Sequence, residues 1–198
     1  MLPDSAIEMK INAVKCLLAR EENQSFSILN SIPFESWRVP KLKKMNVLFL
    51  CTGNSARSIL GEAILRQHGG DRFNAFSAGS QPAGKVNPLT LELLQNLKYE
   101  TKDLRSKSWE EFSKEDSLEI DFVFTVCGSA AEETCPVWQG TPLSAHWGID
   151  DPAAKEGTAS VRMQAFQQAF SQMYHRIELF LNLPLHLLER LALQKELN

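Results

Sequence analysis

The clearest pattern in the chain is an alternation of short apolar runs with longer segments whose apolar residues recur at helical spacing. Apolar runs predict strands at residues 46–51, 73–79, 121–127 and 143–147. Helical spacing and helix-capping residues predict helices at residues 57–68, from Pro88 onward, at 160–181 and from Pro184 to Leu193, with a helical turn at 109–112. Strands that alternate with helices indicate an α/β fold, a three-layer, doubly wound sheet of about four parallel strands.

The first 44 residues do not share this alternation. Residues 5–19 predict a short amphipathic helix, and residues 21–44 look irregular. Because Met45 directly precedes the first strong strand, we predict an N-terminal extension at 1–44 and a catalytic domain at 45–198. The extension is either dispensable, with Met45 as the true initiator, or a regulatory or dimerising arm.

Composition narrows the class of protein. The 198 residues are 43% hydrophobic and 23% charged, which suits one globular domain with a substantial core. A net charge of −3 argues against nucleic acid as a partner. No apolar run is long enough for a membrane span and no export signal is visible, so we expect a cytoplasmic protein. The four histidines make no metal-ligand spacing with the cysteines, so no metal site is expected.

Candidate chemistry is concentrated in the run CTGNSARS, residues 51–58, directly behind the first predicted strand. Cys51 opens the run, and a helix is predicted to begin at Arg57. A helix N-terminus offers backbone N–H donors and a positive dipole end to a tetrahedral dianion. The same field stabilises a thiolate, so Cys51 is the candidate nucleophile. A cysteine after an apolar strand can also be a core residue, but this does not explain the arginine and the small polar residues that follow.

The other residues of this run have separate expected roles. Arg57 presents a planar fork of donors that can bind two oxygens of an anion. Ser58 can donate a hydrogen bond to the Cys51 sulfur. Gly53 permits close backbone approach, and Asn54 tolerates a left-handed conformation and can brace the loop. The expected oxyanion-binding residues are Thr52, Gly53, Asn54, Ser55, Ala56 and Arg57.

Two further sites complete the candidate chemistry. Displacement of an oxyanion's oxygen needs a proton donor, and in Asp150-Asp151-Pro152 we assign that role to Asp151, although Asp before Pro is also a common turn. Cys127 and Cys135 are separated by seven residues, which excludes a thioredoxin-type motif. They are either buried cysteines or a thiol relay, and the small and polar residues between them favour the relay.

The motifs CTGNSARS, FSAG and HWGIDDPA resemble those of arsenate reductases built on the low-molecular-weight protein tyrosine phosphatase fold, over residues 45–193. The resemblance implies that Cys51 attacks arsenate while Asp151 protonates the departing oxygen. Cys127 would then attack Cys51 and release arsenite, and Cys135 would attack Cys127. The implied role is arsenic detoxification, with no tightly bound cofactor and an external reductant of the thioredoxin or glutathione/glutaredoxin type as partner.

Three further expectations accompany this resemblance. The enzymatic alternative is a protein tyrosine phosphatase that forms a phosphocysteine at Cys51, and the non-enzymatic alternative is an oxyanion-binding module. Phosphatases of this fold place aromatic residues after the acid, whereas Ala153-Ala154 follow here, which favours a small inorganic oxyanion. Some relatives bind a structural potassium ion at positions that Asn54, Glu62 and Ser77 match, but the aspartate of that site is not evident near residues 106–108.

Overall fold

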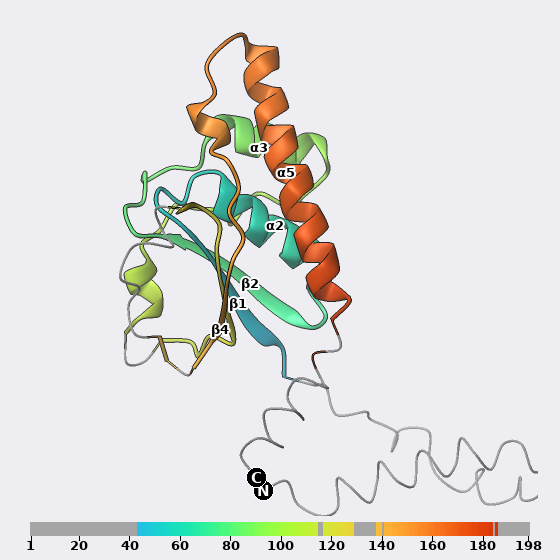
Figure 1. The fold of residues 1–198 in the computed structure, drawn as a ribbon. Coiled ribbons are helices and arrows are strands. Elements are labelled where there is room, and N and C mark those ends of the chain that lie inside the picture. The colour runs from blue at the N-terminus through green and yellow to red at the C-terminus, as the bar shows by residue number, and fades with distance from the viewer. Residues whose placement is uncertain (1–42, 115–116, 129–137, 140, 184, 186–198) are drawn as a thin grey trace, which may run out of the picture. The chain divides into compact units, whose positions relative to one another are not determined.

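The structure is a computed structural model that describes residues 43–114, 117–128, 138–139, 141–183 and 185 (Figure 1). The extension at 1–44, apart from its last two residues, and the helix expected from Pro184 to Leu193, apart from Leu185, lie outside these ranges, as do Cys16 and Cys135. None of the helices in the described ranges has the length and apolarity needed to cross a membrane.

The described residues form a four-stranded sheet in the order β2-β1-β3-β4, in which every pairing is parallel. The strands are β1 (Met45–Cys51), β2 (Phe73–Gly79), β3 (Phe122–Thr125) and β4 (Leu143–His146). This confirms the predicted α/β class and the four parallel strands. β3 is shorter than the predicted 121–127 because the paired register covers only Phe122–Thr125, so that Asp121, Val126 and Cys127 lie outside the strand.

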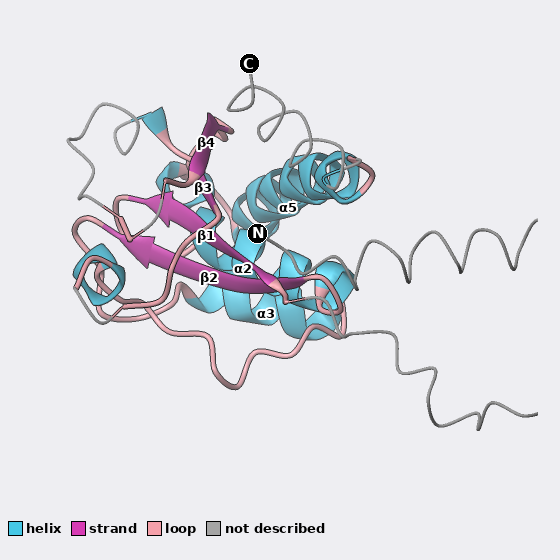
Figure 2. Ribbon diagram, turned by 90° about the horizontal axis from the view of Figure 1, so that it is seen from below, coloured by secondary structure: helices cyan, strands magenta, loops and turns pink. Residues whose placement is uncertain are grey.

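Three α-helices cover one face of the sheet (Figure 2). They are α2 (Arg57–Gly69), α3 (Pro88–Asn96) and α5 (Ala159–Leu181). α5 packs through the apolar stripe that its sequence predicts, since Phe166, Met173, Ile177 and Phe180 are buried. Asn87 caps α3 by accepting a hydrogen bond from the Leu89 N–H at 2.9 Å, and Pro88 is the first helical residue, as expected.

Side chains of β1 alternate between two hydrophobic clusters because successive residues of a strand point to opposite faces. Val47 and Phe49 pack with α2 and α5. Leu48 and Leu50 pack on the other face with Phe112 of the short 3₁₀ helix η4 (Trp109–Phe112). The central strand is therefore buried on both faces, which accounts for its uninterrupted apolar sequence.

Parallel pairing brings the carboxyl ends of neighbouring strands to one edge of the sheet. Cys51 pairs with Gly79 at the ends of β1 and β2. Val126, just beyond β3, donates its N–H to the Leu50 carbonyl at 2.8 Å, so Cys127 follows at the same edge. In open α/β sheets, ligands bind outside this edge.

Candidate active site

Cys51 is the last residue of β1, and its sulfur receives two hydrogen-bonding groups from the loop that follows. The Asn54 N–H donates to Sγ at 3.2 Å, and Ser58 Oγ lies 2.9 Å from Sγ. Because Asn54 Nδ2 donates to Ser58 Oγ, the serine hydroxyl hydrogen remains available to the sulfur. Donors aimed at a buried sulfur stabilise its negative charge, as a thiolate nucleophile requires.

The loop from Thr52 to Ala56 is held by its carbonyl groups. Backbone N–H groups of residues 81, 83 and 87 donate to the carbonyl oxygens of Thr52, Gly53 and Ser55, each at 2.9 Å. In a planar trans peptide the N–H points away from the carbonyl. Tying these carbonyls to residues 81–87 therefore turns the following N–H groups the other way, the direction in which the Asn54 N–H meets Cys51 Sγ.

The N-terminus of α2 continues this row of donors. Its N-cap residue is Ala56, which has no side-chain group that could accept from the first turn. Arg57 and Ser58 follow as the first helical residues. The N–H groups of this turn are thus left for an anion, which is the arrangement expected from the sequence.

Asn54 is fully buried and uses its whole side-chain amide to brace the loop. Its Nδ2 donates to Ser58 Oγ at 2.9 Å and to Ser77 Oγ at 2.8 Å, and its Oδ1 accepts from the Lys107 N–H at 2.8 Å. Its φ of 42° lies in the left-handed region that asparagine tolerates. Asn54 therefore donates its backbone N–H to the Cys51 sulfur, while its side chain makes only the hydrogen bonds that hold the loop against Ser58, Ser77 and Lys107.

Gly79, from the FSAG motif, permits the close contact between β2 and this loop. A Cβ at Gly79 would stand 2.4 Å from the Thr52 carbonyl oxygen, which is backbone and cannot rotate away. The glycine at this position is therefore required by the loop's approach to the sheet.

Arg57 joins the loop to the predicted acid. Its Nη2 lies 3.2 Å from Asp151 Oδ2, and its Nη1 donates to the Ile149 carbonyl at 3.1 Å. Asp151 also accepts from the Ala153 N–H at 3.1 Å, at the start of the 3₁₀ helix η5 (Pro152–Ala154). The structure thus brings the predicted anion-binding arginine and the predicted acid together, although 94 sequence positions separate them.

Cys127 lies against the same loop. Its Sγ is 3.6 Å from Thr52 Oγ1, and the residue is almost fully buried. Thr52 directly follows Cys51 in the sequence. Thr52 therefore has Cys51 beside it in the chain and Cys127 against its side chain, and these are two of the three cysteines expected to react. Cys135, the third, lies outside the described residues.

A buried ion pair behind the loop was not anticipated from the sequence. Lys107 Nζ lies 3.2 Å from Glu62 Oε2, and both side chains are almost completely buried. Burial lowers the pKa of Lys107 from its usual value, and the adjacent Glu62 carboxylate opposes that shift. Glu62 Oε2 also accepts from the Ser77 hydroxyl at 2.5 Å, and Oε1 pairs with Arg66.

This ion pair bears on the potassium ion that some relatives bind at the positions that Asn54, Glu62 and Ser77 match. Asn54, Glu62 and Ser77 do lie together, but Lys107 already supplies a positive charge to the carboxylate among them. A potassium ion at Glu62 Oε2 would face this ammonium. The residues present therefore do not fit potassium. The described ranges also contain no group of three or more His, Cys, Asp or Glu residues that could hold a metal ion.

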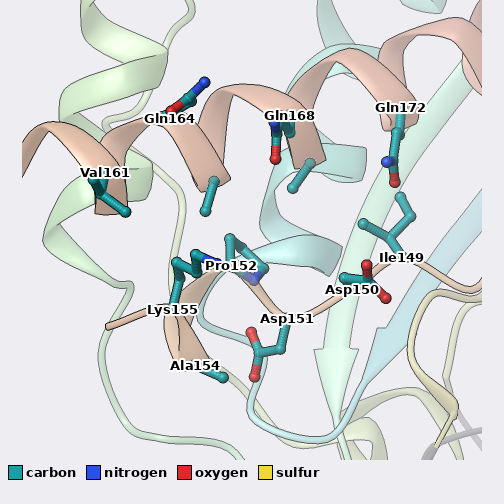
Figure 3. Close-up of a pocket in the computed structure, with 12 residues that line it drawn as sticks. Ile149, Asp150, Asp151, Pro152, Ala154, Lys155, Val161, Gln164, Gln168 and Gln172 are labelled. Carbon is teal, nitrogen blue, oxygen red and sulfur yellow. The ribbon is translucent and has the colours of Figure 1, made fainter. Parts of the chain in front are cut away.

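A cavity of about 540 Å³ lies beside the Asp151 loop (Figure 3). It is bounded by Asp150, Asp151 and Lys155 on the loop side and by α5 on the other, where Gln168 and Gln172 extend toward the loop. Cys51 is not among the described residues that line it, so we do not place the reaction there.

Residues 46–196 match the family described as low molecular weight phosphotyrosine protein phosphatase. The chain belongs to this family. Curated relatives include arsenate reductases of Bacillus licheniformis, 33% identical over 70% of this chain and 96% of the relative, and of Bacillus subtilis, 31% identical over 68% and 93%. The resemblance predicted from the three motifs is confirmed.

Solved structures of the family show the same fold. An arsenate reductase in a phosphate-binding state has a TM-score of 0.57 at 22% identity, covering 69% of this chain and 96% of its own. The tyrosine phosphatase Wzb from Escherichia coli K30, solved with sulphate, has a TM-score of 0.56 at 19% identity, covering 70% and 97%. Both a reductase and a phosphatase thus share the fold, and the residues must distinguish between them.

Proposed function

We propose that the protein is an arsenate reductase that uses Cys51 as nucleophile and Cys127 and Cys135 as a thiol relay. The observation that carries this proposal is the position of Cys127, whose Sγ lies 3.6 Å from the side chain of the residue after Cys51. A phosphatase needs one thiol and a water, whereas a reductase needs a second thiol close to the first.

In the first step, the Cys51 thiolate attacks arsenic, and an arsenate oxygen leaves as water after it takes a proton from Asp151. Arg57 binds oxygens of the arsenate, and the loop N–H groups receive the remaining charge. Because Asp151 rests against Arg57 in this structure, anion binding and positioning of the acid depend on the same guanidinium. The product of this step is a Cys51–arsenate adduct with arsenic still in the +5 state.

In the second step, the Cys127 thiolate attacks Cys51 Sγ. The electron pair of the S–As bond passes to arsenic, which leaves as arsenite in the +3 state, and a Cys51–Cys127 disulfide forms. Cys135 then attacks Cys127, which frees the Cys51 thiolate and leaves a Cys127–Cys135 disulfide. An external dithiol reductant of the thioredoxin type, or a glutathione/glutaredoxin system, supplies the two electrons that restore both thiols.

The sequence after the acid supports a small substrate. Ala153 and Ala154 are both exposed and offer no ring surface on which a phosphotyrosine could stack. Arsenate presents no ring and requires none. Arsenic detoxification is the role that this activity would serve.

The test compares arsenate reduction with aryl-phosphate hydrolysis on the same samples. We expect Cys127→Ser and Cys135→Ser to abolish sustained arsenite production, while Cys51→Ser abolishes both activities. Cys16→Ser is the matched control, since Cys16 has no place in the relay, and it should retain arsenate reduction. Unchanged arsenite production in Cys127→Ser and Cys135→Ser would refute the relay, and aryl-phosphate turnover alone would favour the phosphatase. Binding without turnover under any reductant would favour the oxyanion-binding module.

A further inference from the structure

Lys107 is a buried charged residue that the proposed mechanism does not use. It is 7% exposed, and its Nζ contacts Glu62 Oε2 at 3.2 Å and the Arg105 carbonyl at 3.4 Å. Lysine is almost never buried to this extent unless it is paired. Its partner Glu62 lies on α2, one turn beyond Ser58.

Lys107 is connected to the reactive sulfur through a chain of hydrogen bonds. Ser77 donates to the carboxylate oxygen of Glu62 that Lys107 contacts, and it accepts from Asn54 Nδ2. The same amide nitrogen of Asn54 donates to Ser58 Oγ, which lies 2.9 Å from Cys51 Sγ. This series of hydrogen bonds thus connects the Lys107 ammonium to the Cys51 sulfur through the side chains of Glu62, Ser77, Asn54 and Ser58.

The backbone of Lys107 holds the other side of the same network. Its N–H donates to Asn54 Oδ1 at 2.8 Å, and its carbonyl accepts from the Gly79 N–H at 2.9 Å. Lys107 therefore fixes the orientation of the Asn54 amide directly, and through Glu62 and Ser77 it fixes the partner of that amide. Lys107 thus meets this buried network at two points, Asn54 Oδ1 and Glu62 Oε2, and in a low-dielectric interior a fully satisfied network of this kind is rigid.

We propose that Lys107 is a positioning residue whose ammonium takes the place of the potassium ion that some relatives hold at these positions, so that the oxyanion loop of this protein works without potassium. A tethered ammonium has the single charge of potassium, and it also donates hydrogen bonds. The loop geometry is then independent of the ions in solution. This inference rests on the proposed function only in taking Cys51 and its loop as the oxyanion site.

The experiment measures phosphate binding by calorimetry and the alkylation of Cys51 by iodoacetamide, followed by mass spectrometry. Both are compared in potassium chloride and in choline chloride at equal ionic strength. We expect the natural protein to give the same values in both salts, within about twofold. A saturable gain in potassium would overturn the proposal without any substitution, even if a variant failed to fold.

Variants then test the ammonium itself. Lys107→Met keeps the apolar stem and removes the charge, and it should weaken phosphate binding about tenfold or more in choline, because Glu62 Oε2 loses the buried cation that it shares with the Ser77 hydroxyl. Lys107→Ala opens space beside Glu62 and should regain part of the loss when potassium or ammonium is added. Phosphate binding by Lys107→Met equal to that of the natural protein in choline would overturn the proposal.

Arg66→Met is the matched control. Arg66 also pairs with Glu62, but through Oε1 rather than the oxygen shared by Ser77 and Lys107, and its side chain is 38% exposed. Its removal should change phosphate binding by less than about threefold, since partly exposed pairs contribute little. An equal loss in both variants would assign the effect to Glu62 burial in general and overturn the specific role of Lys107. Because phosphate binding needs no turnover, a failed relay would leave these results unchanged.

Discussion

Ser58→Ala tests the network at the sulfur most sharply. The hydroxyl lies 2.9 Å from Cys51 Sγ, accepts from Asn54 Nδ2 at 2.9 Å and is fully buried. Alanine fits the same helical position and removes one of the two groups directed at the sulfur. The Asn54 N–H, at 3.2 Å, remains as the other.

The size of the effect follows from the charge on the sulfur. A hydrogen bond to a charged group contributes about 1.5–3 kcal/mol. Since about 1.4 kcal/mol corresponds to a tenfold change in rate, kcat/KM for arsenate should fall by roughly 10- to 150-fold. The loss should appear also in the rate of Cys51 alkylation, which requires no arsenate.

Ser58→Ala also leaves one N–H of the buried Asn54 amide without its acceptor. We expect a loss of about 1–3 kcal/mol in the free energy of unfolding, measured with denaturant. Because the second N–H still reaches Ser77, the loop should keep its conformation. A folded variant with reduced reactivity is therefore the expected result.

Ser106→Ala is the matched control for this prediction. Ser106 Oγ donates to the Gly53 carbonyl at 3.2 Å, a bond to the same loop but not to the sulfur or to Asn54. That carbonyl keeps the N–H of Ala83 as a donor. We expect less than about a threefold change in kcat/KM. Ser58→Ala that is folded and fully active, or an equal loss in Ser106→Ala, would refute the role assigned to the hydroxyl.

Three further predictions concern the loop and its acid. Gly79→Ala should destabilise the protein by about 1–3 kcal/mol in denaturant unfolding and weaken phosphate binding, because its Cβ would meet the Thr52 carbonyl oxygen at 2.4 Å; unaltered binding would contradict this. Asp151→Asn should slow formation of the arsenate adduct by about 10²–10⁴-fold in rapid-quench experiments and leave phosphate affinity within a few-fold; a normal rate would remove Asp151 as the acid. Arg57→Lys should weaken phosphate binding about tenfold or more, measured by calorimetry, because a lysine ammonium cannot form the two parallel hydrogen bonds that a guanidinium makes to two phosphate oxygens. An unchanged Kd would contradict this.

Much of the fold could be predicted because its elements carry strong local signals. The apolar run of β1 and the stripe of α5 are periodic, and the Asn87-Pro88 cap marks the start of α3. The edge strand β4 is also predicted at its observed position, although all four of its residues are exposed.

Lys107 shows what the sequence could not reveal. It lies in the stretch 98–114, where charged residues are frequent and nothing marks one lysine as buried. Lys107 is buried because it lies beside the end of β2. There Gly79 forms a β-bridge with Ser108, the residue after Lys107, and the space at Gly79 cannot hold a side chain. Glu62 and Ser77 could be named from their positions, but their partner depends on tertiary contacts.

The pairing of Arg57 with Asp151 also depends on tertiary structure. The sequence indicates an anion-binding arginine and a loop carboxylate as separate features, each with a common structural explanation. Only the parallel sheet, which brings the segment after β4 to the edge where α2 begins, places the two side chains within 3.2 Å.

The most direct test is a single turnover of the fully reduced protein with arsenate and no external reductant. If Cys51, Cys127 and Cys135 act as a relay, one equivalent of arsenite forms per protein molecule, and peptide mapping finds a Cys127–Cys135 disulfide with Cys51 as a free thiol. If no arsenite forms, or if it forms while Cys127 and Cys135 both remain reduced, the relay is wrong.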